Sequence, residues 1–153
     1  MSIKIDDTDR SILQFLVKDS KTTYQEIADA LDVSAGTIHF RVNKLKESGI
    51  ITGSKVILDN EKLGLEVCAF IGINLVSAKS YGTAQKKLNA LSEIVELYYT
   101  TGSYSLFAKV LLKGTKHLHH FLVEKLQALP EVQSTETLIV LDQPISREGS
   151  FPR

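Results

Sequence analysis

Hydrophobic positions in the first part of the chain recur at helical spacing in two consecutive stretches. In "DDTDRSILQFLVKDS", Ile12, Leu13 and Leu16 fall on one side of a helix whose first turn is acidic. In "TTYQEIADAL", Thr23 and Glu26 have the spacing of a capping box, which marks the start of a second helix. The pattern therefore predicts two amphipathic helices before residue 33.

A third helix is predicted from Ser34 to Gly49. Ser34 is a favourable N-cap, and Ile38, Val42 and Leu45 form an apolar stripe at positions i, i+4 and i+7. The connection "LDV" before it is too short for two stacked antiparallel helices and fits the corner of a helix-turn-helix. The third helix would then be the recognition helix, with its polar side turned outward.

The stretch "IITGSKVILD" after this helix predicts two short β segments, broken at Gly53 and Ser54, that form a small wing. The polar "DNEKLG" that follows contains two turn-forming residues and is interpreted as a linker. We therefore expect a winged helix-turn-helix domain over 1–58 and a linker over 59–64.

The second half of the chain is predicted to contain both strands and helices, in the order β-α-β-β-α-β. Its strands are predicted in "EVCAFIGINLV", "EIVELYYTTG", "YSLFAKVLLKG" and "EVQSTETLIVL", and its helices in "YGTAQKKLNAL" and "TKHLHHFLVEKLQALP". This order predicts a ferredoxin-like βαββαβ domain over 65–142, which makes the whole chain an α+β protein. Both helices would cover one face of the sheet, and we expect the bare face to be buried in a homodimer.

The last residues, 143–153 in the stretch "DQPISREGSFPR" that begins at Asp142, are expected to form an extended tail that either crosses to a neighbour or is disordered. A two-fold dimer would pair two helix-turn-helix units and so match a palindromic site on double-stranded DNA.

Composition limits the class of protein further. The 18 Lys and Arg residues balance the 18 Asp and Glu residues, but positive charge is concentrated between Ser34 and Lys55, as a phosphate-contacting element requires. No apolar run reaches the roughly 18 residues of a membrane helix, and the acidic start lacks a secretory signal, so we expect a cytoplasmic protein with no membrane partner. The single cysteine, Cys68, excludes an internal disulfide, and we assign it no chemistry.

Candidate DNA contacts lie on the outer side of the third helix and just after it. We expect Thr37, Phe40 and Lys44 to face the major groove. Phe40 is interpreted as a contact for thymine methyl groups, with a hydrophobic patch against another domain as the alternative. The complete predicted set is Ser34, Thr37, His39, Phe40, Arg41, Asn43, Lys44, Lys46 and Lys55.

Within this set, Ser34, His39 and Asn43 are placed at the edges of the groove. Arg41 lies nearer the core side, where either a phosphate contact or an intramolecular ion pair is expected rather than base readout. Lys46 and Lys55 are assigned to phosphates.

A second candidate site is the stretch "YYTTGSYS". It could be a plain strand connection in which Gly102 supplies a turn. Alternatively, its hydroxyls and backbone amides, together with polar residues of the last strand, would bind a small zwitterion. The predicted ligand-binding residues are Tyr99, Thr100, Thr101, Gly102, Ser103, Tyr104, Ser105, Gln133, Ser134 and Thr135.

Other chemistry is poorly supported. His117 and His120 have helical i, i+3 spacing, and Glu124 is the only nearby residue that could complete a metal site, so we predict no metal. The sequence has no Gly-rich phosphate loop and no arrangement of a nucleophile with a base, so we predict that it is not an enzyme and uses no cofactor.

Three stretches carry a resemblance to a known family: "GTIHFRVNKLKESGIITG", "YYTTGSYSLF" and "QSTETLIVL". Over essentially its whole length the chain resembles the Lrp/AsnC family of transcription regulators. The resemblance implies a DNA-binding dimer that assembles further, commonly into an octamer. It also implies an amino-acid effector bound between subunits of the second domain, with L-asparagine preferred.

Two positions depart from many members of that family. Ala35 stands where many relatives carry Pro at the first helical position, and a good helix former serves there equally well. Ser105 stands where many relatives carry Asp, which removes a possible carboxylate partner for an effector's ammonium group.

Two other functions fit parts of these patterns. The chain could be an amino-acid-binding regulatory subunit of a metabolic enzyme, because ferredoxin-like domains also serve that purpose. It could also be an architectural DNA-binding protein without an effector.

Overall fold

The structure, a computed structural model, describes residues 4–151. Residues 1–3 and 152–153, which the predicted DNA-binding domain and tail include, lie outside the described residues. The chain divides into two compact units: one comprises the described residues up to Ile57 together with those from Ile145 on, and the other runs from Leu58 to Pro144. Between residues 4 and 151, no helix is both long and apolar enough to cross a membrane.

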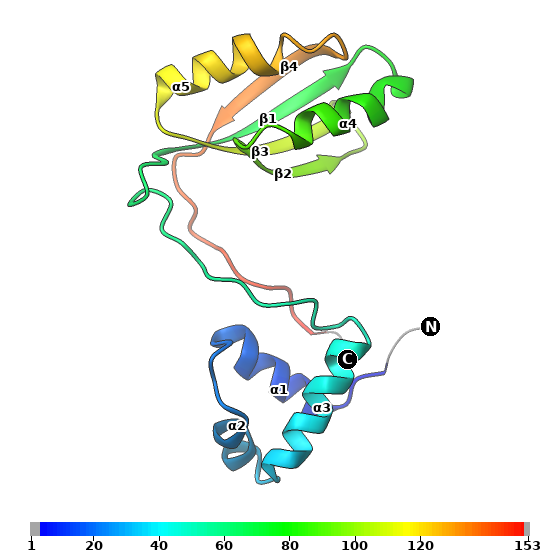
Figure 1. Cartoon of the computed structure of the whole chain (residues 1–153), viewed down its shortest axis with the longest axis vertical. Helices are drawn as coiled ribbons and strands as arrows, with labels where there is room; N and C mark the ends of the chain where they lie inside the picture. The colour runs from blue at the N-terminus through cyan, green and yellow to red at the C-terminus, as the bar shows by residue number, and fades with distance from the viewer. Residues whose placement is uncertain (1–3, 152–153) are drawn as a thin grey trace. The chain divides into compact units, whose positions relative to one another are not determined.

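The N-terminal unit contains the three predicted helices (Figure 1). They are α1 (Asp7–Lys18), α2 (Tyr24–Leu31) and α3 (Ala35–Glu47). Their apolar sides meet in one core cluster of buried residues, which are Ile12, Leu13, Ile27, Ala28, Ile38, Val42 and Leu45. The helical spacing in the sequence correctly identified this core.

Each helix of this unit begins at a side-chain cap. The predicted capping box of α2 is present: the Thr23 hydroxyl accepts from Glu26 N at 3.2 Å, and the Glu26 carboxylate accepts from Thr23 N at 2.7 Å. At the start of α3, Ser34 Oγ accepts from Thr37 N at 3.1 Å. These bonds satisfy amide groups that have no partner within the helix, so the chain enters each helix at a defined residue.

The two β segments predicted over 50–59 are not formed. Residues 50–58, all of which the structure describes, adopt no strand. A two-stranded hairpin is marginal unless one face is buried, and here Val56 and Ile57 expose 80% and 90% of their surface. Apolar character alone was therefore insufficient to predict pairing.

The second unit has the predicted order of elements. These are β1 (Val67–Leu75), the 3-10 turn η1 (Ala78–Ser80), α4 (Tyr81–Asn89), β2 (Ile94–Tyr99), β3 (Leu106–Leu112), α5 (Thr115–His120), the π-helical continuation η2 (Phe121–Leu126) and β4 (Val132–Ile139). The strands form one sheet in the order β2-β3-β1-β4, and all neighbours are antiparallel. This is the ferredoxin-like arrangement that the sequence predicted.

The two faces of this sheet differ in what covers them. On one face, β1 residues such as Ile71 and Ile73 pack with Leu88 of α4 and Phe121 of η2 in a single buried core. Figure 1 shows α4 and α5 on the same side of the sheet. The opposite face, which we call the open face, carries Phe70 stacked on Phe107 with their ring centroids 5.7 Å apart.

The segment after β4 returns to the N-terminal unit. Phe151 is half-buried and packs against the core cluster of the three helices. This residue of the tail therefore contacts the helical core of its own chain. The chain therefore passes between the two units twice, once at Ile57 and once at Ile145.

We expect Phe151→Ala to lower the stability of the N-terminal unit by about 1–2 kcal/mol, less than the roughly 3–5 kcal/mol of a fully buried Phe. Hydrogen exchange of the amides in residues 7–47 measures this loss. Ile145→Ala is the matched control, because Ile145 is 66% exposed. If the amides of residues 7–47 exchange at the same rate in Phe151→Ala and in the unmodified chain, Phe151 does not stabilise the N-terminal unit.

Candidate DNA-binding and effector sites

The outer side of α3 presents a mixed polar and aromatic surface. Phe40 is 69% exposed, although a ring of this size is usually covered in a folded domain. Lys44 and Lys46 are exposed on the last two turns of the same helix. The surface therefore combines positive charge with an apolar group that has no covering element in the described chain.

Three of the predicted edge residues are held by neighbours. His39 meets the ring of Tyr24 edge-on at 5.7 Å between centroids, and Asn43 Nδ2 lies 3.3 Å from His39 Nδ1. The hydroxyls of Ser34 and Thr37 lie 2.8 Å apart. These contacts limit the rotamers of the side chains along the edge of α3 before any ligand is present.

Arg41 connects α3 to the first turn of α1. Its Nη1 donates to Asp6 Oδ2 at 2.7 Å and to Asp9 Oδ1 at 2.9 Å. Of the two roles expected for Arg41, this is the intramolecular ion pair. The same carboxylates also form the capping box of α1, where Asp6 accepts from Asp9 N at 2.8 Å.

This network lowers the pKa of Asp6. The backbone hydrogen bond from Asp9 contributes most, and the hydrogen bond from Arg41 comes next. The pKa of Arg41 is raised in turn, chiefly by its hydrogen bond to Asp6. Lys55, the last of the predicted DNA contacts, lies outside α3 in the exposed segment that follows it.

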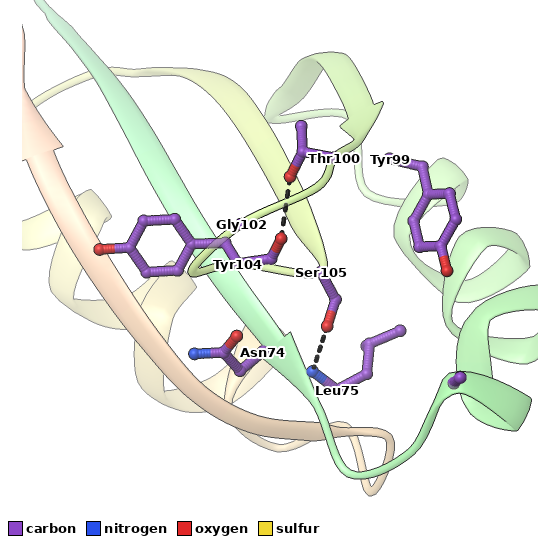
Figure 2. Close-up of a pocket in the computed structure, with 8 residues that line it drawn as sticks. Asn74, Leu75, Tyr99, Thr100, Gly102, Tyr104 and Ser105 are labelled. Carbon is purple, nitrogen blue, oxygen red and sulfur yellow. Dashed lines mark hydrogen bonds between the residues drawn. The ribbon is translucent and has the colours of Figure 1, made fainter.

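The second site is a cavity of about 200 Å³ at one end of the sheet. Figure 2 shows it between the end of β1 and the loop that joins β2 to β3. Within residues 4–151, no charged side chain lines it. The lining residues are Asn74, Leu75, Ala78, Tyr99, Thr100, Gly102, Tyr104 and Ser105.

Ser105 closes the cavity by extending the pairing of β3 with β1. Its N–H donates to Ile73 O at 3.0 Å, and its carbonyl accepts from Thr100 N at 3.1 Å. Because that carbonyl is turned to the loop, the Ser105 hydroxyl accepts the next β1 amide, Leu75 N, at 3.3 Å. The hydroxyl predicted as a ligand contact is thus also a structural acceptor.

The loop itself is compact. Thr100 Oγ1 donates to Tyr104 O at 2.9 Å, which draws the two ends of the loop together (Figure 2). Gly102 lies between them with φ +102°, a conformation that residues with a side chain rarely adopt. Thr101 and Ser103 are exposed and do not line the cavity.

The polar residues predicted on the last strand lie outside the lining. Ser134 Oγ accepts from Asn74 Nδ2 at 3.2 Å, and so supports a lining residue without being one. Thr135 Oγ1 accepts from Gln127 Nε2 at 2.9 Å, and Gln133 is exposed.

Sequence reasoning missed three lining residues and one supporting residue. Asn74, Leu75 and Ala78 line the cavity from β1 and η1, and Tyr81 of α4 packs on Tyr99 with centroids 4.4 Å apart. Asn74 carried a signal, because an amide side chain at an outward position of an otherwise apolar strand needs a partner.

The histidines considered for a metal are engaged otherwise or exposed. His117 Nδ1 accepts from Lys113 N at 3.2 Å, and its Nε2 lies 3.4 Å from the carboxylate of Glu93, to which Lys125 also donates. His120 and Glu124 are exposed. Among the described residues, no three His, Cys, Asp or Glu side chains are grouped to hold a metal ion.

We expect Arg41→Gln to lower the stability of the N-terminal unit by about 0.5–1 kcal/mol at pH 7, a small value because the pair is partly solvent-screened. The folded pKa of Asp6 lies below 3.8, so its stabilisation is present above that pH and is lost as pH falls through the lowered pKa. The difference from the unmodified chain should therefore shrink below about pH 4. Urea unfolding, followed by the NMR signals of residues 7–47 at pH 7 and at pH 3, measures the loss of stability and its decrease at low pH.

Lys21→Gln is the comparison for this test, because Lys21 is exposed between α1 and α2. A loss at pH 7 no larger than that of Lys21→Gln would show that Arg41 does not hold α3 to α1.

Comparison with known proteins identifies both domains. Residues 5–52 match the family described as winged helix-turn-helix DNA-binding, and residues 68–149 match the Lrp/AsnC ligand binding domain. The regulatory protein AsnC of Haemophilus influenzae is 53% identical over 94% of this chain and 96% of its own length. That of Escherichia coli K12 is 50% identical over 94% of each chain.

Solved structures agree as well. The structure of E. coli AsnC superimposes with a TM-score of 0.92 at 48% identity, covering 97% of this chain and 99% of that one. A transcriptional regulator from Neisseria meningitidis, solved as a complex with L-Met, has the same fold, with a TM-score of 0.91 at 21% identity over 97% of each chain. The resemblance stated from the sequence is confirmed: the chain belongs to the Lrp/AsnC family and is a DNA-binding transcription regulator with a ligand-binding domain, not an enzyme.

Proposed function

We propose that the outer side of α3 enters the major groove of double-stranded DNA. The observation that supports this is the exposure of Phe40 beside Thr37 and Lys44, on the side opposite the buried stripe of the helix. Phe40 would contact thymine methyl groups, while Lys46 and Lys55 would contact phosphates. Arg41 acts indirectly, by holding α3 against α1.

The open face of the sheet supports a homodimer. Phe70 and Phe107 lie on it, and Leu138 of β4 is 49% exposed there. Burying two such faces against each other removes apolar surface from water and pairs two recognition helices about a two-fold axis. The operator would then be palindromic. Further assembly, to an octamer, would bring a second subunit over the exposed side of the effector cavity.

We propose L-asparagine as the effector. A lining of hydroxyl, amide and backbone groups without charged side chains suits a zwitterion with a neutral polar side chain. The cavity is also smaller than the roughly 300–1,000 Å³ of sites for drug-sized molecules. Tyr99 is 61% exposed, so the cavity is open on one side and a second subunit can complete it.

The effector would act by favouring one assembly over another. Asparagine can shift the equilibrium between assemblies only by as much as it binds one of them better. If a second subunit completes the cavity, the affinity for asparagine depends on how the subunits are arranged. Asparagine would then bind one assembly more tightly than another. The spacing of paired recognition helices changes in consequence. Such a regulator acts in the compartment that holds the DNA, which we propose to be the cytoplasm.

For the DNA contact, we expect Phe40→Ala to weaken binding to a fragment from upstream of the protein's own gene by about 1–3 kcal/mol. Replacing thymine by uracil in that fragment removes the methyl groups. It should weaken binding by the unmodified protein but not further weaken binding by Phe40→Ala. Fluorescence anisotropy at two salt concentrations measures both effects.

Lys46→Ala is the contrasting variant for this experiment. It should weaken binding to all fragments alike and reduce the slope of affinity against salt by about one phosphate contact. If uracil weakens binding by Phe40→Ala as much as binding by the unmodified protein, Phe40 does not read thymine.

For the effector, isothermal titration should show asparagine binding at least about tenfold tighter than aspartate, because the lining offers no cation to the extra carboxylate. Strong binding of a different amino acid would replace asparagine and leave the regulator in place. If no amino acid alters DNA binding, the architectural function becomes the better description. If the protein retards no DNA but purifies with a metabolic enzyme, the regulatory-subunit function does.

A further inference from the structure

Gly72 lies in the middle of β1 on the open face, and the ring of Tyr104 rests directly on it. A Cβ atom at position 72 would lie 2.6 Å from Cδ1 of Tyr104 and 2.7 Å from Cε1 and Cγ. Real Cβ atoms do not approach other atoms so closely. Gly72 is buried although no helix covers this face, since the ring itself covers it. A glycine inside a strand often marks such a close approach.

The ring of Tyr104 is also fixed from the side. Phe107 lies directly opposite Gly72 in the pairing of β1 with β3, and its ring centroid is 6.1 Å from that of Tyr104. Phe107 in turn stacks on Phe70. Tyr104 is therefore the end of a row of three aromatic side chains on the open face.

Tyr104 is also one of the residues that line the candidate effector cavity. Its carbonyl accepts from the hydroxyl of Thr100, and its neighbour Ser105 is bonded to Ile73 and Leu75 of β1. Figure 2 shows the Tyr104 ring extending across β1, away from Tyr99, while its backbone forms the wall beside Gly102. A clash with the ring that rotation about its χ angles cannot relieve would therefore displace the loop that lines the cavity.

We infer that Gly72 is a positioning residue for effector binding: by leaving room for the Tyr104 ring, it fixes the loop that forms the wall of the cavity. Gly72 does not itself line the cavity. The inference rests on the proposed function of that cavity as the asparagine site. It adds a determinant of affinity that lies on the open face, behind the cavity wall.

Gly72→Ala tests this in the full chain. We expect asparagine affinity, measured by isothermal titration, to fall by about tenfold or more, since a site displaced by an ångström loses much of its complementarity. The inference requires this loss to occur in an oligomer of unchanged mass. Because Gly72 lies on the face proposed for the homodimer, a smaller oligomer would assign Gly72 to that interface instead. Gly82→Ala is the matched control, because a Cβ at that position in α4 meets nothing within 4 Å.

Tyr104→Ala provides a second variant that keeps the test decisive if Gly72→Ala alone is unstable. Without the ring, position 72 has room, so Gly72→Ala should cause no additional loss of asparagine affinity in the Tyr104→Ala background. Tyr104→Phe keeps the ring and should preserve the effect of Gly72→Ala.

Three results would overturn the inference while leaving the proposed effector intact. They are asparagine binding by Gly72→Ala within about twofold of the unmodified protein, an equal loss from Gly72→Ala with and without the Tyr104 ring, or a loss that accompanies a smaller oligomer. If the unmodified protein does not bind asparagine, both the proposed effector and the inference fall.

Discussion

The ligand-binding domain depends on the register of strand β1, which is paired on both edges. Ile71 and Ile73 point into the core beneath α4 and η2, while Phe70, Gly72 and Asn74 point to the open face. A slip of one residue would exchange these sets, putting an amide and a glycine into the core and isoleucines on the open face. The buried apolar set therefore fixes the register, and through it the place of both the aromatic row and the effector cavity.

The DNA-binding domain follows the same logic with helices. Ile38, Val42 and Leu45 fix which side of α3 is buried, and so which side is left exposed as the proposed DNA contact. The bonds from Arg41 to Asp6 and Asp9 add a polar constraint between α3 and the first turn of α1. Asp6 and Asp9 thus cap α1 and also bind Arg41 of α3. This explains why Arg41 is directed toward α1.

Local patterns in the sequence predicted the elements well, because helix starts depend on residues three apart and cores on fixed periods. The exception was the segment after α3, where apolar side chains such as Val56 and Ile57 have no surface to cover. The candidate effector site was only half predictable. Its loop is contiguous, from Tyr99 to Ser105, but Asn74 and Ala78 reach it through the pairing of β1 with β3, which periodicity does not reveal. Similarly, nothing in the sequence of β1 showed which side chain would rest on Gly72.

The chain passes between its two units twice, and the two passages differ in what fixes them. The first passage, residues 50–58, forms no strand. The second leaves β4, whose Ser134 bonds to Asn74 of the cavity, and ends with Phe151 on the core of the three helices. Two attachments close a loop, which reduces the freedom of each unit at a cost that grows only slowly with loop length.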